Sequence, residues 1–205
     1  MRRLAHAHEP PQDVEVPRRP RLDAPGAIQH VIGKGCAREP IVRDDLDRER
    51  LVAGVGETSG RHGWTCLAYC LLDTHFHLIV RTPEANLGAG MQRLLSRYAA
   101  EFNKRYERVG NLFHTRFYST EIRSEEHLSS ALVYVILNPV RAGLTDRAEK
   151  WRWSSYPGTL GIAAAPSFLA TDATLELVDG NSETARRQLR AAVREARARD
   201  RAILR

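Results

Sequence analysis

Apolar and polar residues alternate over residues 27–34, and this pattern predicts a strand that begins the folded part of the chain. Residues 64–72 are rich in aromatic and apolar side chains, and residues 75–82 follow after a two-residue turn. These two segments therefore predict a hairpin of buried strands. Partial alternation over residues 111–123 predicts a fourth strand, which is enough for one small sheet.

Other segments have the spacing of helices. Residues 44–56 begin with acids and space their apolar residues by turns, and a loop is expected over residues 57–63. Asn86 is expected to cap a second helix, because the apolar residues after it fall on one helical face. These are Leu87, Met91, Leu94, Leu95, Tyr98 and Phe102. Ser124 and the acids after it predict a third helix, which should end near Pro139.

The order strand, helix, strand, strand, helix, strand is typical of the ferredoxin-like fold. We therefore expect an α+β class, with a ferredoxin-like antiparallel sheet, helices on one face and a C-terminal helical tail. Residues 1–24 are rich in Pro and Arg and are predicted to be a flexible arm. Residues 25–160 would form the domain, and residues 161–205 an Arg-rich helical tail.

Composition places the chain among globular proteins, because 42% of its 205 residues are hydrophobic and 27% are charged. The net charge of +6 favours a polyanionic partner such as nucleic acid. Residues 186–205 hold eight arginines and two acids, which accounts for the whole excess and leaves the remaining residues neutral. A DNA path in the domain would thus depend on the local arrangement of its arginines.

No apolar run, residues 67–72 included, is long enough to cross a bilayer, so we expect a cytoplasmic protein with no membrane partner. The three cysteines, Cys36, Cys66 and Cys70, cannot all pair within one chain, which argues against a disulfide framework. On an extended strand Cys66 and Cys70 would lie about 13 Å apart, too far to share one zinc ion. Free buried thiols are therefore expected.

Two histidines open the second strand of the predicted hairpin. Residues two apart on a strand point to the same face about 6.6 Å apart, so His75 and His77 are near enough to bind one ion. Two buried, hydrogen-bonded histidines would give the same pattern. Spacing alone leaves the metal and structural interpretations open.

Tyr134 and Asn138 lie four residues apart on the predicted third helix. This spacing places both side chains on one helical face, where the phenol and the amide can address the same point. A packing tyrosine followed by an asparagine that ends a helix would look the same, and spacing alone favours that structural interpretation.

Further short blocks link these positions in a fixed order. They are residues 25–31, 41–45, 75–80, 90–93, 96–98, 102–103, 110–113, 116–117, 134–144 and 153–156. Together they resemble the single-stranded-DNA transposases of the HUH superfamily, which have a His-hydrophobic-His metal site and one tyrosine nucleophile. The nearest branch is the REP-associated tyrosine transposases.

The resemblance implies a metal-dependent endonuclease and strand transferase that acts on single-stranded DNA near a hairpin (REP-like) element through a 5′-phosphotyrosine intermediate. It implies Tyr134 as the nucleophile. The matching ligands of Mg²⁺ or Mn²⁺ are His75, His77 and Asn138, and the bound ion would polarise the scissile phosphate. Among the matched blocks, the arginines expected to bind DNA are Arg97, Arg116 and Arg141, although a solvated helix face would explain each of them equally well.

The chain departs from the family pattern in two places. Residues 72–74 are Leu-Asp-Thr where the family usually has Met-Pro-Asn, and Ile136 stands where many members have His. An alternative is therefore a domesticated, non-catalytic protein that binds hairpin DNA. An RNA-binding module is disfavoured, because the central strands lack the aromatic pair typical of such sheets. Related proteins occur both as monomers and as homodimers, and both states remain open.

Overall fold

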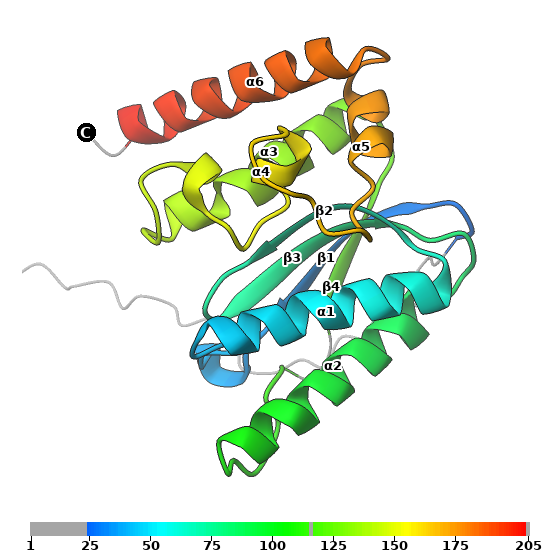
Figure 1. The fold of residues 1–205 in the computed structure, drawn as a ribbon, viewed down its shortest axis with the longest axis vertical. Coiled ribbons are helices and arrows are strands. Elements are labelled where there is room, and N and C mark those ends of the chain that lie inside the picture. Colours follow the sequence, from blue (N-terminus) through cyan, green and yellow to red (C-terminus); the bar gives the residue numbers. More distant parts are fainter. Residues whose placement is uncertain (1–23, 115–116, 204–205) are drawn as a thin grey trace, which may run out of the picture.

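The computed structural model describes residues 24–114 and 117–203, and its centre is a four-stranded antiparallel sheet (Figure 1). The strands are β1 (Ile28–Lys34), β2 (Thr65–Leu71), β3 (His75–Arg81) and β4 (Tyr118–Ile122). They lie in the order β2-β3-β1-β4, and every neighbouring pair is antiparallel. With one helix after β1 and another after β3, this is the ferredoxin-like arrangement that the sequence predicts.

Helices α1 (Asp45–His62) and α2 (Leu87–Arg105) cover one face of the sheet (Figure 1). Their apolar stripes pack against alternate residues of the strands, and both sets are almost completely buried. This first core includes Val31, Leu51, Val55, Phe76, Leu78, Met91 and Phe102. The alternation in the strands and the helical periodicity thus meet in one core, as the sequence patterns predict.

The helices that follow β4 cover the opposite face and form a third layer (Figure 1). They are α3 (Glu125–Arg141), α4 (Tyr156–Thr159), α5 (Thr171–Val178) and α6 (Ser182–Ile203), and short 3-10 turns lie at Cys36–Arg38 and Ala148–Lys150. The expected placement of helices on one face therefore holds for α1 and α2. Helix α6 buries Leu189 and Val193 in the same core as α3, so the Arg-rich tail is part of the folded body.

Of the predicted arm, residues 1–24, only Ala24 lies within the described part of the chain, where it is exposed. The predicted boundary at residues 160 and 161 follows α4, and the helix expected in the tail is α6. None of the helices in residues 24–114 and 117–203 is long and apolar enough to cross a membrane.

Some local expectations are wrong. The strand expected over residues 111–123 is limited to β4, because Phe113 makes only a single bridge to Gly35. The loop expected over residues 57–63 is helical: α1 continues to the left-handed Gly63, which has φ 66°. Asn86 precedes α2, but its side chain bonds to the Trp64 indole and the His62 carbonyl instead of capping the helix.

Helix α3 also runs past the end that the sequence predicts for it. Pro139 lies in its last turn, where the missing N–H costs only the bond to the carbonyl of Val135. The backbone continues with bonds from Ala142 to the carbonyl of Asn138 and from Leu144 to that of Pro139, both of 2.9 Å. Because the helix does not break before Pro139, Asn138 keeps helical geometry relative to the rest of α3.

All three cysteines are free, as expected, but only Cys66 and Cys70 are buried, and Cys36 is partly exposed. A bulge in β2 between Cys66 and Ala68 shifts the alternation, so Cys66 faces the core under α1 and α2 while Cys70 faces the core under α3. Cys36, Cys66 and Cys70 are free, and burial raises the pKa of Cys66 to about 12. Two thiols on opposite faces of a sheet cannot share an ion, which agrees with the prediction against a zinc site.

Candidate functional site

The turn before β3 is anchored to the first helix. The Asp73 carbonyl accepts a hydrogen bond of 2.7 Å from the N–H of Ile41, and its carboxylate forms a 2.6 Å ion pair with Arg48 of α1. Both contacts come from the loop and helix that follow β1, and Thr74 completes the turn. His75 therefore enters β3 from a fixed position.

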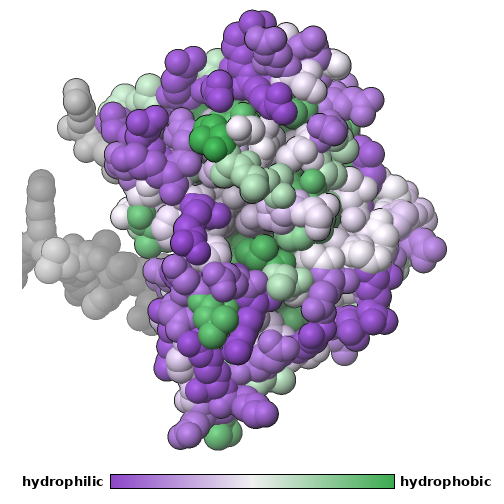
Figure 2. Space-filling view, viewed as in Figure 1, coloured by the Kyte–Doolittle hydropathy of each residue, from purple (hydrophilic) through white to green (hydrophobic). Residues whose placement is uncertain are grey.

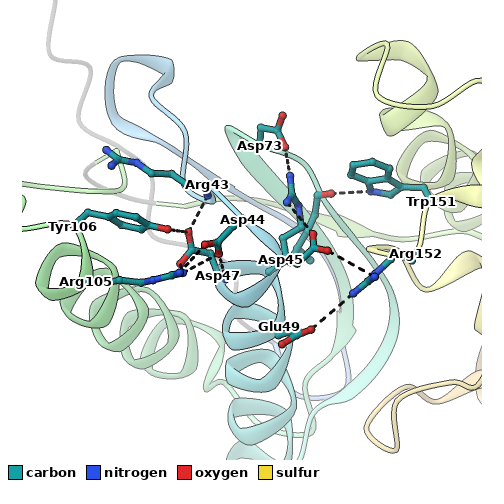
Figure 3. Close-up of polar contacts among 12 residues, drawn as sticks. Arg43, Asp44, Asp45, Asp47, Glu49, Asp73, Arg105, Tyr106, Trp151 and Arg152 are labelled. Atoms are coloured by element: carbon teal, nitrogen blue, oxygen red, sulfur yellow. Dashed lines mark hydrogen bonds and ion pairs between the residues drawn. The ribbon is translucent and has the colours of Figure 1, made fainter.

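A buried carboxylate at the start of α1, that of Asp47, links the loop after β1 to the end of α2 (Figure 3). Asp47 is 1% exposed and accepts hydrogen bonds from the Arg43 N–H at 2.9 Å, the Arg105 guanidinium at 2.6 Å and the Tyr106 hydroxyl at 2.8 Å. Arg105 also binds Asp44, and this hydrogen bond lowers the pKa of Asp44 to about 2. The network joins the loop after β1 to the end of α2.

The two histidines of β3 point to the α3 side of the sheet, with ring centroids 5.1 Å apart. His77 is 1% exposed, and its Nδ1 lies 3.0 Å from Nε2 of His30, whereas its Nε2 is buried without a hydrogen-bond partner. His75 is partly exposed, and its Nδ1 lies 3.1 Å from the Thr74 hydroxyl. In both histidines the Nδ1 atom is engaged by a neighbour, and the buried Nε2 of His77 has no hydrogen-bond partner in the described part of the chain.

Helix α3 brings the other two predicted residues to the same place. The Tyr134 ring centroid lies 5.5 Å from that of His77 and 5.8 Å from that of His30, and the side chain of Tyr134 is 43% exposed. Asn138 is buried one turn further on, and its Nδ2 donates a 2.9 Å hydrogen bond to the Tyr134 carbonyl. The Asn138 side chain also lies close enough to His75 and His77 to influence the pKa of each. The four residues that the sequence singles out therefore converge.

Burial sets the charge of the histidines. It lowers the pKa of His77 to about 3, and the neighbouring His30, His75 and Lys34 act in the same direction. Burial also lowers the pKa of His75 and of His30, while the Asn138 amide favours the protonated forms of His75 and His77 to a lesser extent. At neutral pH these imidazoles are uncharged, which is the form that binds a metal ion.

The donor atoms fit a divalent cation. In residues 24–114 and 117–203 no three His, Cys, Asp or Glu side chains form a metal-binding group, and the third donor that the sequence predicts beside the histidine pair is the amide of Asn138. The buried Nε2 of His77 lacks any other partner. The carbonyl oxygen is a donor that suits Mg²⁺ and Mn²⁺, whereas the two imidazole nitrogens are donors more typical of the later first-row ions.

The three arginines expected to bind DNA differ in position. Arg141 lies at the end of α3, with its guanidinium 5.5 Å from the Tyr134 ring centroid, and forms a 2.8 Å ion pair with Asp200 of α6. Arg97 lies on α2, on the other side of the sheet from Tyr134, and pairs with Glu57 and with Glu101. Arg116 is outside the described residues.

His30 is the site residue that sequence reasoning missed. It is two residues from Ile32, which lies opposite His77 in the β1–β3 register, so the two imidazoles are diagonal neighbours. The sequence could have indicated this residue. The strand pattern places His30 on one face with Ile28 and Ile32, and a ferredoxin-like sheet pairs the first strand with the third.

Fold and site together define a ferredoxin-like domain in which a histidine pair on a central strand faces a tyrosine on a covering helix. The model of the family "Transposase IS200 like" matches residues 25–136, which is more than half of the chain. The protein therefore belongs to the IS200-like transposase family.

Two known proteins are similar to this chain, one in sequence and one in structure. A Haemophilus influenzae protein named as a REP-associated tyrosine transposase is 28% identical over 134 residues, which cover 57% of this chain and 76% of that protein. A solved structure of a REP-associated tyrosine transposase bound to a REP hairpin has a TM-score of 0.61 at 16% identity. The alignment covers 74% of this chain and 89% of that one. This structural similarity supports the fold.

Proposed function

We propose that this protein is a metal-dependent single-stranded DNA endonuclease and strand transferase, with Tyr134 as its nucleophile and a 5′-phosphotyrosine intermediate. The observation that carries the proposal is the position of Tyr134. Its partly exposed ring lies 5.5 Å from that of His77, whose buried Nε2 has no partner of its own. A tyrosine that served only as packing would need neither the adjacent histidine pair nor the asparagine.

His75, His77 and Asn138 are the residues that would hold Mg²⁺ or Mn²⁺. When bound, the ion supplies Lewis-acid polarisation of the scissile phosphate. The protein's own contribution is to keep the imidazoles neutral by burial and to hold the strand and the helix at a fixed separation. The amide of Asn138 is fixed by its bond to the Tyr134 carbonyl, so ligand and nucleophile share one turn of α3.

Tyr134 would attack the scissile phosphorus through its phenolic oxygen. The new bond joins this oxygen to phosphorus and the bond to the 3′ oxygen breaks; the phenol loses its proton and the departing 3′ oxygen gains one. A free tyrosine has a pKa near 10, so its phenolate is a fair leaving group that another 3′-OH can displace. The same residue can thus support cutting and strand transfer. Arg141 lies beside the Tyr134 ring, where its positive charge is available to a bound phosphate.

The proposed substrate is single-stranded DNA that carries a hairpin next to the cleavage site. The solved relative bound to a REP hairpin supports this choice. We place the reaction in the cytoplasm, by a monomer or a homodimer. If Tyr134 acts on the histidine pair of a second subunit, then mixing Tyr134→Phe with His75→Ala protein should restore cleavage.

The test is incubation of the full chain with labelled hairpin-bearing single-stranded DNA and Mn²⁺ or Mg²⁺. We expect the wild type to form a denaturation-resistant protein–DNA adduct, and Tyr134→Phe to bind the DNA without forming it. Tyr118→Phe is a matched control, because Tyr118 is also exposed but lies on β4. A wild type that binds hairpins of varied sequence and yields no adduct would instead support the alternative, a domesticated hairpin-binding protein.

A further inference from the structure

His30 makes the closest side-chain contact to the proposed metal site from outside it. Its Nε2 lies 3.0 Å from Nδ1 of His77, and the two rings are stacked with centroids 5.2 Å apart. His30 belongs to β1 and His77 to β3, so the contact is fixed by strand pairing. Thr74 holds the same position relative to Nδ1 of His75, at 3.1 Å.

We propose that His30 is a positioning residue that accepts the Nδ1 proton of His77 and thereby leaves the Nε2 lone pair of His77 free for a metal ion. The proposal rests on the proposed function. A neutral imidazole has one N–H donor and one acceptor nitrogen, so a His77 that binds metal through Nε2 must carry its proton on Nδ1. His30 must then accept through Nε2 and carry its own proton on Nδ1.

The burial pattern favours this role over simple packing. Buried polar atoms are usually hydrogen-bonded, and Nε2 of His77 is buried without a partner among the described residues, which favours a ligand at this atom. Residues that hold the second nitrogen of a metal-binding histidine fix its tautomer and orientation, and their loss weakens metal affinity about 10- to 100-fold.

The tautomer can be read directly in the unmodified protein. Two-bond ¹H–¹⁵N NMR of histidine-labelled full chain should show His77 with its proton on Nδ1 before metal is added. A proton on Nε2 of His77 would overturn the proposal, whatever any variant does.

The second test of the role of His30 is the affinity for Mn²⁺ in the absence of DNA, measured from the EPR signal of free Mn²⁺. We expect His30→Leu to bind Mn²⁺ about 10- to 100-fold more weakly and His30→Gln, whose amide oxygen can accept the same proton, to recover most of the affinity. Wild-type affinity in His30→Leu would refute the role of His30, provided that His77→Ala abolishes binding. If His77→Ala itself retains full affinity, the metal site of the proposed function fails instead.

An independent observation concerns α6. Arg194, Arg197 and Arg201 line a shallow groove of about 500 Å³ with Ala198 and Ala202. No carboxylate in the described residues forms an ion pair with these three arginines; Arg197 donates a hydrogen bond from Nη2 to the Asp146 carbonyl, and its Nε is buried without a partner. In Figure 2 the top of the molecule, where α6 lies in Figure 1, is mainly hydrophilic.

We infer that this groove, the α6 basic groove, binds the phosphate backbone of the DNA strand that flanks the cleavage site. The inference deepens the proposed function. Asp200 precedes Arg201 on α6 and pairs with Arg141 beside Tyr134, so the end of α6 that carries the groove lies near the proposed nucleophile. A bilayer is a poorer partner, because Leu189 and Val193 of α6 are buried in the core and the groove is lined by arginines and alanines alone.

The test measures binding of a hairpin with a single-stranded flank by fluorescence anisotropy over a range of salt, in the Tyr134→Phe background. For Arg194→Ala/Arg201→Ala we expect weaker binding and a slope of log affinity against log salt reduced by about 1.4, from two lost single-strand contacts. Arg199→Ala, on another face of the same helix, is the matched control and should leave the slope unchanged. An equal effect of both changes would overturn the inference.

Two further measurements decide whether the α6 basic groove serves DNA or a different partner. If the protein with intact arginines does not bind the hairpin at all, the result contradicts the proposed function and not specifically the assignment of the α6 basic groove. If the double variant loses binding to phosphatidylserine vesicles or to RNA but keeps its DNA affinity and salt slope, the groove serves that partner and our assignment is wrong.

Discussion

Asp47 should contribute far more to stability than Asp45, although both lie in the first turn of α1 (Figure 3). Asp47→Ala removes a buried acceptor of three hydrogen bonds and leaves Arg105 with Asp44 alone. Hydrogen bonds to charged groups contribute about 1.5–3 kcal/mol each and are not additive. Breaking a buried pair costs about 3–5 kcal/mol, so we expect a loss of that size in the free energy of unfolding.

Asp45→Ala is the matched control. The Asp45 side chain is 59% exposed and pairs with Arg48 at 3.4 Å and with Arg152 at 3.7 Å, contacts worth about 0–1 kcal/mol. If the free energy of unfolding falls by about 2 kcal/mol per M of urea, the midpoints of the two variants in urea denaturation should differ by about 2 M. Equal midpoints, or a loss below about 1 kcal/mol for Asp47→Ala, would refute the assignment of a structural network at this position.

Other expectations concern acid stability, the C-terminal helix and DNA contact. The pKa of Asp44 is lowered from 3.8 to about 2, so its ionised carboxylate stabilises the folded state fully above pH 3.8, and this stabilisation is lost as the pH falls through 2. In Asp44→Asn, the acid unfolding curve should lack the part that depends on this titration. Leu189→Ala should cost about 2–5 kcal/mol in urea denaturation, because Leu189 is buried in the core shared with α3, whereas the exposed Arg187→Ala should change stability by less than about 0.5 kcal/mol. Arg141→Ala should weaken hairpin binding in anisotropy titrations more than Arg97→Ala does, since Arg141 adjoins Tyr134; the reverse order would place the DNA on the α2 side.

Local pattern carried most of the fold and showed which of the four proposed site residues share a face, whereas their proposed roles came from the resemblance to a known family. His75 and His77 share a face because a strand repeats every two residues, and Tyr134 and Asn138 because a helix repeats every 3.6. These relations hold within one element, so the sequence shows them directly.

The features that were missed depend on contacts between distant segments. His30 becomes part of the site only through the register of β1 against β3. Residues 57–63 look like a loop because Gly60 and polar residues have low helix propensity, yet burial of Thr58 and Ser59 keeps them in α1. Asn86 would cap α2 if Trp64 and His62 did not engage its side chain.

The packing of α6 on α3 has a consequence for the order in which the molecule is completed. The chain is made from its N-terminus, and α3 with Tyr134 emerges well before Leu189 and Val193 of α6. Until those residues arrive, the outer surface of α3 lacks its apolar cover and Arg141 lacks Asp200. A nascent chain therefore carries an incompletely packed tyrosine helix until α6 has been synthesised and has folded against it.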